Sequence, residues 1–90
     1  MVIKSKKDVQ KFLSMVKNNS PHPFGFRDSS LSMPNGGSTQ IWYEDGNFYT
    51  FSQGIGWHDM APTALEDPEK FVWENRKDIN ASLRLGGGWY

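Results

Sequence analysis

The residues of this chain best suited to acid–base chemistry stand together in the segment Trp57-His58-Asp59. An imidazole beside an aromatic ring and a carboxylate can be tuned to exchange a proton near neutral pH, so His58 is a candidate general acid or base. Adjacent residues of an extended chain point to opposite sides, however, so Asp59 is not placed to orient His58. His22 would complete the two-histidine arrangement that cleaves RNA, but nothing in the spacing brings the two histidines together.

The sequence has neither the ligand spacing of a metal site nor a motif for nucleophilic catalysis or phosphate binding. The chain has no cysteine, which excludes a disulfide, a zinc thiolate site, an iron–sulfur cluster and a cysteine nucleophile. The histidines and Asp59 do not follow metal-ligand spacing, and Asn35-Gly36-Gly37-Ser38 lacks the lysine and the following helix of a phosphate-binding loop. We therefore expect no metal, no cofactor and no catalytic activity, with a small histidine-dependent ribonuclease as an alternative.

The segment from Thr39 to Phe51 predicts a β-hairpin with aromatic side chains on both faces. Its Asp45-Gly46 dipeptide tolerates the positive φ angles of a type I′ turn, and residues that favour strands flank it. With these two residues as the loop, the register pairs Tyr43 with Phe48, Trp42 with Tyr49 and Ile41 with Thr50. Because side chains alternate across a strand, one face carries Ile41, Tyr43, Phe48 and Thr50, and the other carries Trp42, Tyr49 and Phe51.

Helices are predicted on either side of this hairpin. The first runs from about Lys6 to Lys17, because Ser5 and Asp8 form an acidic variant of the capping box. Its apolar residues recur with helical spacing at Val9, Phe12, Leu13 and Val16. The second helix opens at Asp67-Pro68-Glu69, in the order of N-cap, proline and first-turn acid. Its inward-facing stripe is predicted to contain Phe71, Val72, Asn75 and Ile79.

The order of elements predicts the fold class. A short strand at Phe24 to Arg27 follows the first helix, which makes the order helix, strand, hairpin, helix. We expect a single α+β domain over residues 1–90, with an antiparallel sheet of about three strands covered by helix on one side. Residues 82–85 form either a short C-terminal strand or an extension of the last helix. Flexible segments are expected at about 28–38 and 86–90.

The charges are separated along the chain although the net charge is zero. Residues 1–27 contain six basic residues and one acid, whereas residues 28–69 contain seven acids and no lysine or arginine. The hairpin lies inside the acidic block. Such asymmetry bears on partners and association rates, unless the two segments simply face one another in the folded domain.

Aromatic residues with an acidic rim favour a protein partner that has a basic surface, since Trp and Tyr are enriched in interface hot spots. We expect a small protein-binding module of this kind, such as an inhibitor that occupies the nucleic-acid groove of its partner. The expected partner-binding residues are Trp42, Glu44, Asp45, Tyr49, Phe51, Trp57 and Asp59.

Two alternatives use other surfaces. A nucleic-acid-binding domain would use the basic N-terminal helix, with the lysines Lys4, Lys6, Lys7, Lys11 and Lys17. A homodimer would use the second hairpin face, and in a further possibility the C-terminal helix or the Trp89-Tyr90 tail covers that face as core. The chain turns polar directly after Met1-Val2-Ile3 and has no run able to span a membrane, so we expect a cytoplasmic protein without membrane contact.

Overall fold

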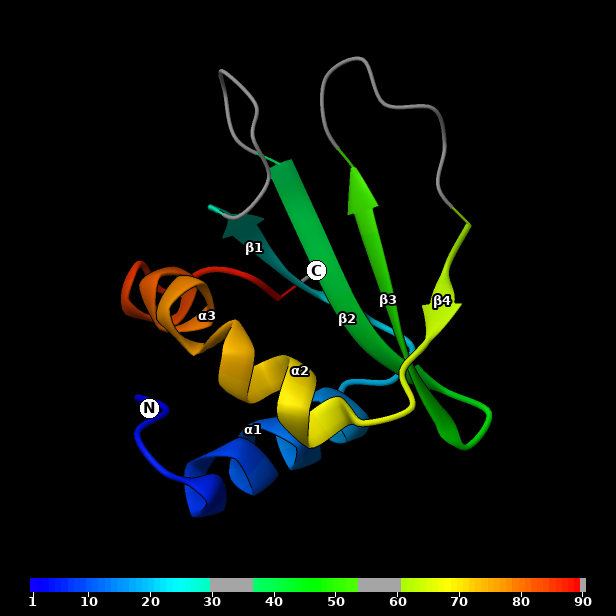
Figure 1. Cartoon of the computed structure of the whole chain (residues 1–90), viewed down its shortest axis with the longest axis horizontal. Coiled ribbons are helices and arrows are strands. Elements are labelled where there is room, and N and C mark those ends of the chain that lie inside the picture. The colour runs from blue at the N-terminus through cyan, green and yellow to red at the C-terminus, as the bar shows by residue number, and fades with distance from the viewer. Residues whose placement is uncertain (30–36, 54–60, 90) are drawn as a thin grey trace.

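The computed structural model describes residues 1–29, 37–53 and 61–89, with Gln53 described by its backbone (Figure 1). The elements in chain order are α1 (Lys6–Asn18), β1 (Phe24–Asp28), β2 (Gly37–Glu44), β3 (Asn47–Gln53), β4 (Thr63–Ala64), α2 (Pro68–Glu74) and α3 (Arg76–Arg84). The predicted α+β class is confirmed, and the described residues form a sheet of four strands where about three were expected. Most of the loop expected to be flexible at 28–38 lies outside the described residues.

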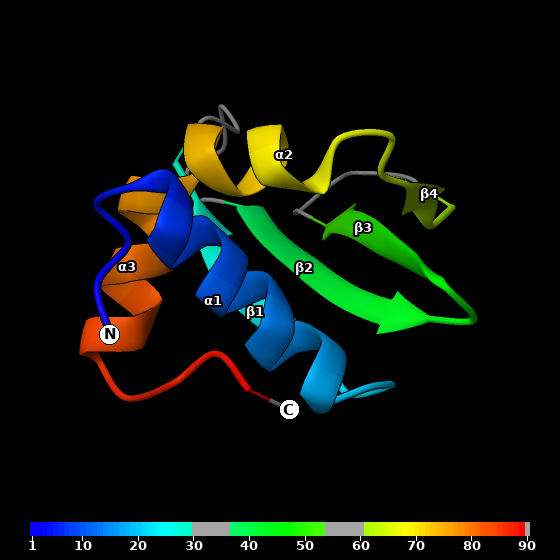
Figure 2. The ribbon, with the colours of Figure 1, turned by 90° about the horizontal axis from the view of Figure 1, so that it is seen from below.

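The described part of the domain has two layers. The antiparallel sheet has the strand order β1-β2-β3-β4. Helices α1, α2 and α3 all lie on one face of this sheet, as the two perpendicular views show (Figures 1 and 2). The sheet therefore has a helix-covered face and an opposite face, which we call the open face, that no described helix covers.

Helix α1 begins at the predicted capping box. The Asp8 N–H donates to the Ser5 hydroxyl at 3.4 Å, and the Ser5 N–H donates to the Asp8 carboxylate at 3.1 Å. The Lys4 N–H donates to the same carboxylate at 3.0 Å. These bonds to the charged form lower the pKa of Asp8, the Lys4 backbone contributing most.

The cap predicts a pH-dependent contribution to stability. A folded-state pKa below the unfolded value means that the Asp8 carboxylate stabilises the fold above the unfolded pKa, and that this contribution is lost as the pH falls through the folded pKa. We expect Asp8→Ala to be less stable than the wild type above about pH 5 and equal to it in strong acid. Urea unfolding of both proteins between pH 7 and pH 2 measures the difference. A difference that stays constant with pH would contradict the role of the charge.

The hairpin forms with the predicted register. Tyr43 pairs with Phe48, Trp42 with Tyr49 and Ile41 with Thr50, all antiparallel. Asp45 and Gly46 have φ angles of 50° and 86°, the left-handed values that a type I′ turn requires at both loop residues. The expected division of the faces follows from this register, since Ile41 is fully buried on the helix-covered face.

The C-terminal helix is interrupted at Asn75, where the sequence predicted one continuous stripe. The Asn75 side-chain amide donates to the Phe71 carbonyl at 2.8 Å, and its backbone has φ −101° and ψ 12°. The interruption lets α2 contact α1 while α3 contacts β1. Val72 and Ile79, one on each side of the break, are both fully buried. The apolar stripe was therefore predicted correctly, but the break was not.

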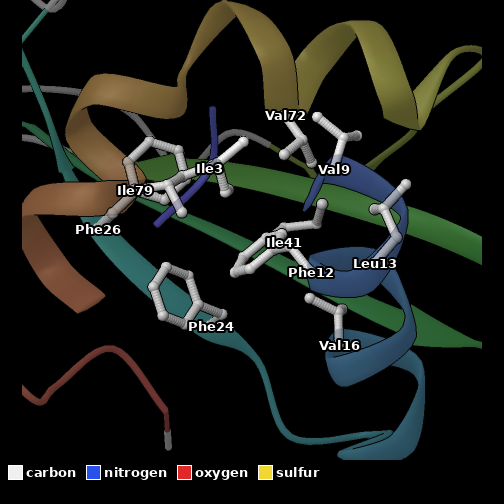
Figure 3. Close-up of a cluster of buried hydrophobic side chains, with 10 residues drawn as sticks. All are labelled: Ile3, Val9, Phe12, Leu13, Val16, Phe24, Phe26, Ile41, Val72 and Ile79. Atoms are coloured by element: carbon white, nitrogen blue, oxygen red, sulfur yellow. The ribbon is translucent and has the colours of Figure 1, made fainter. Parts of the chain in front are cut away.

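The core lies between the sheet and the helices (Figure 3). All four apolar residues predicted on the face of α1 are buried. One of them, Phe12, packs edge to face on Phe24 of β1 at a centroid distance of 5.0 Å, and both rings are fully buried. The complete buried cluster is Ile3, Val9, Phe12, Leu13, Val16, Phe24, Phe26, Ile41, Val72 and Ile79.

The residues after α3 pack against β1. Residues 82–85, for which a strand and a helix extension were both open, continue α3 as far as Arg84. The Gly25 N–H then donates to the Gly88 carbonyl, and Trp89 forms a single antiparallel bridge with Phe24. Gly88 has φ 105°, and a Cβ there would overlap the Phe24 ring. The tail that we expected to be flexible thus pairs with the edge strand through Trp89.

Candidate functional site

The open face of the sheet carries the aromatic residues that the sequence singled out. By the register of the strands, each residue of β2 on this face lies beside a defined residue of β3 or β1. Trp42 lies opposite Tyr49, and Gln40 lies between Gly25 and Phe51. The described residues of this face are Gly25, Arg27, Ser38, Gln40, Trp42, Glu44, Asn47, Tyr49, Phe51 and Ala64.

Trp42 and Tyr49 form a stacked pair on this face. Their ring centroids are 5.9 Å apart and the ring planes differ by 20°. Both side chains are half-buried, as is that of Phe51, so each ring retains surface that solvent reaches. Stacked aromatic pairs contribute about 0.5 to 1.5 kcal/mol beyond the area they bury, so the two rings hold one another in place. The result is a preformed aromatic surface on the two central strands of the sheet, close to the hairpin turn.

The C-terminal elements do not cover this face. Helix α3 contacts β1 from the helix layer, and the Trp89 ring lies 4.8 Å from Phe24 and 6.1 Å from Phe12, both of which belong to the core. Helix α3 and Trp89 therefore do not bury Trp42, Tyr49 and Phe51, contrary to that possibility, and Tyr90 lies outside the described residues.

The described acidic residues near the open face lie at one end of it. Glu44 and Asp45 are exposed at the hairpin turn. The Leu65 N–H donates to the Phe48 carbonyl at 2.8 Å, so the exposed Glu66 leaves the sheet at the same end. Acidic side chains thus gather beside the Trp42–Tyr49 pair.

The end of the open face away from the hairpin turn carries a basic side chain. Arg27 is exposed there, in the row of Ser38, which lies six residues or about 20 Å along β2 from Glu44. Asp28, the first acid of the block, points to the other side of the sheet, where it is 7% exposed and accepts a hydrogen bond from the Thr39 hydroxyl at 3.1 Å. Asp28 is therefore part of the interior and not of an acidic surface.

The basic N-terminal segment lies in the other layer. Lys4, Lys6, Lys7, Lys11 and Lys17 are all exposed on α1 or just before it. Helix α1 lies on the helix-covered face of the sheet (Figure 2), whereas the register places Trp42 and Tyr49 on the open face, so the two groups belong to opposite sides of the sheet. A single strand of nucleic acid needs bases stacked on rings and phosphates near cations at the same site. The described structure does not bring these two groups together.

Of the two histidine candidates, His22 lies within the described residues and His58 lies outside them. His22 is exposed in the turn between α1 and β1. Trp57, His58 and Asp59 lie outside the described residues, so their predicted roles stay predictions. Within residues 1–29, 37–53 and 61–89, no group of three or more His, Asp or Glu side chains is arranged to hold a metal ion. None of the helices in these ranges combines the length and the apolar character that crossing a membrane requires.

Sequence reasoning assigned Arg27 to the basic N-terminal segment and so missed its place on the open face. The signal was available in Phe24-Gly25-Phe26-Arg27, where large apolar residues alternate with Gly25 and Arg27. Alternation of this kind puts Phe24 and Phe26 in the core and Arg27 on the other side of β1. The same alternation, applied to β2, places Gln40 on the open face.

Comparison with protein-family models, with curated protein sequences and with solved structures finds no match to this chain.

Proposed function

We propose that this domain is a non-catalytic cytoplasmic module that binds a protein partner through the open face of its sheet. The observation that carries the proposal is the stacked Trp42–Tyr49 pair, which retains exposed surface on the face opposite all described helices. Large aromatic side chains supply contact area at low entropic cost and dominate interface hot spots. A soluble domain gains nothing in stability by leaving such rings partly in water, which supports a role in recognition.

The partner surface that fits this site is basic next to an apolar centre. Glu44, Asp45 and Glu66 stand at the turn end of the face, where they attract cations and orient an approaching surface. Proteins that hold nucleic acid present such basic surfaces to phosphate. A domain seated on one would compete with the nucleic acid, which makes inhibition the expected consequence of binding.

Affinity capture from the native host tests this proposal. The tagged domain, treated with nuclease, should recover a specific protein, and Trp42→Ala with Tyr49→Ala should lose it. The matched control is Lys7→Ala with Lys11→Ala, which alters the exposed side of α1 and should recover the protein as before.

Three results would overturn the proposal. Recovery of nucleic acid alone, lost with the two lysine changes and falling steeply with salt, would favour the basic helix as the binding surface. Elution of the purified domain as a dimer that Trp42→Ala dissociates would make a second copy the occupant of the open face. Ribonuclease activity abolished by His58→Ala in a folded protein would show an enzyme.

A further inference from the structure

We infer that the domain has a second docking surface, a groove between its N-terminal segment and α3, which accepts an acidic amphipathic helix of a partner protein. The groove has a volume of about 590 Å³ and is lined by Met1, Val2, Lys77, Asn80, Leu83 and Arg84. It belongs to the helix layer, whereas the Trp42–Tyr49 pair lies on the open face. The inference does not depend on the proposed function.

Asn80 fixes one wall of this groove. Its side-chain oxygen accepts a hydrogen bond from the Ile3 N–H at 2.7 Å, and its side-chain nitrogen donates to the Ile3 carbonyl at 3.1 Å. The side chain of Ile3 is buried in the core with only 2% exposed. The N-terminal segment is therefore held along α3 by one amide that satisfies both backbone groups of Ile3.

Apolar side chains are exposed on the N-terminal side of the groove. Met1 and Val2 are 48% and 52% exposed, although Ile3 beside them is buried. They account for two of the four large apolar side chains that are exposed in the described chain, and Leu85, at the end of α3, is a third. Three of these four side chains therefore belong to the N-terminal segment or the end of α3, where apolar side chains of a partner can contact them.

The charges of the groove select the partner. Lys77 and Arg84 are both exposed, and none of the described residues that line the groove is acidic. They stand seven residues apart on α3, which is two helical turns or about 10 Å. Two acidic residues seven apart on a second helix have the same spacing, so a helix lying along α3 can face both cations at once. Apolar residues between those acids would then contact Val2 and Leu83.

This charge pattern is the reverse of the one on the open face. The turn end of the open face is acidic, whereas the rim of the groove is basic. The two surfaces therefore select different partners, or different parts of one partner, and the domain can bind both at the same time.

A synthetic helix tests the inference. The probe is a capped peptide of about sixteen residues, with two glutamates seven residues apart on one face and leucines between them. We expect saturable binding by fluorescence anisotropy, with amide shifts in NMR spectra confined to Val2, Lys77, Asn80, Leu83 and Arg84. Replacing both glutamates of the peptide by lysine should abolish binding.

Charge reversal on the protein supplies the matched comparison. Lys77→Glu with Arg84→Glu should weaken peptide binding at least tenfold, whereas Lys7→Glu with Lys11→Glu, which changes the net charge equally on the exposed side of α1, should leave it within twofold. If the first variant does not fold, Lys77→Gln with Arg84→Gln takes its place.

Three outcomes would overturn the inference. They are the absence of saturable peptide binding at millimolar concentration, equal weakening by both charge reversals, and binding to phosphatidylglycerol vesicles in place of the peptide. The last would assign the exposed apolar and basic side chains to a membrane surface. None of these outcomes bears on capture through Trp42, so the two proposals fail separately.

Discussion

Replacing Trp89 with alanine is expected to lower the free energy of unfolding by about 2 to 3 kcal/mol. Full burial of such a ring is worth about 3 to 5 kcal/mol on truncation, and Trp89 is half-buried. Its ring packs edge to face on Phe24 at 4.8 Å and lies 6.1 Å from Phe12. The substitution therefore removes contacts with two fully buried rings and frees the backbone segment that pairs with the edge of β1.

Urea unfolding followed by far-ultraviolet circular dichroism measures this loss without relying on tryptophan fluorescence. Leu85→Ala is the matched control, because Leu85 lies in the same segment, is 85% exposed and should change the free energy by less than about 0.5 kcal/mol. Equal, small effects of both substitutions would mean that the tail is not held against the core and that the sequence-based expectation of a flexible tail was right.

Trp42→Ala is expected to weaken partner binding about thirtyfold or more while costing only about 1 kcal/mol of stability. Hot-spot aromatics contribute about 2 kcal/mol or more to binding, and thirtyfold corresponds to that energy. The folded domain loses mainly the stacking of Trp42 on Tyr49, whose centroids are 5.9 Å apart, because the ring is not part of the core.

Affinity for the captured protein is measured by calorimetry, and stability by urea unfolding. Trp73→Ala is the control: this ring is 37% exposed in the helix layer, with the Arg76 guanidinium 4.0 Å from its centroid. Its removal should leave partner affinity unchanged. A stability loss of about 3 to 5 kcal/mol for Trp42→Ala would instead place Trp42 in the core and remove the basis of the proposed site.

The hairpin and the first helix could be predicted from the sequence because local chemistry determines both. Asp45-Gly46 selects the turn, the turn selects the register, and alternation then divides the side chains between two faces. Ser5 and Asp8 in the same way determine where α1 begins.

Features that depend on distant parts of the chain were not predictable. The stripe that includes Val72 and Ile79 is compatible with a straight or a broken helix, and only the packing of α2 on α1 and of α3 on β1 distinguishes them. The two residues Thr63–Ala64 are too few to show a period, so β4 had no signal. The place of Trp89 depends on a contact with Phe24, which is 65 positions earlier in the chain.

The sequence predicted which aromatic residues share a face of the sheet, but not whether the helices cover that face. Alternation identified Trp42, Tyr49 and Phe51 as one face, and no local rule states which face of a sheet the helices cover. The structure assigns the helices to the face of Ile41. It also buries Asp28, the first acid of the acidic block, because the register of β1 turns that carboxylate toward Thr39. Trp57 and Asp59, expected in the same site, lie outside the described residues.

The indole N–H signals of the tryptophans offer the most direct test of binding through the open face. Trp42 lies on the open face, whereas Trp73 and Trp89 lie on the helix side of the sheet. When the captured partner is titrated into the isotope-labelled domain, the Trp42 indole signal, assigned with Trp42→Phe, should shift or broaden while those of Trp73 and Trp89 stay unchanged. An unchanged Trp42 signal, with shifts concentrated at the backbone amides of Lys7 and Lys11, would contradict the account.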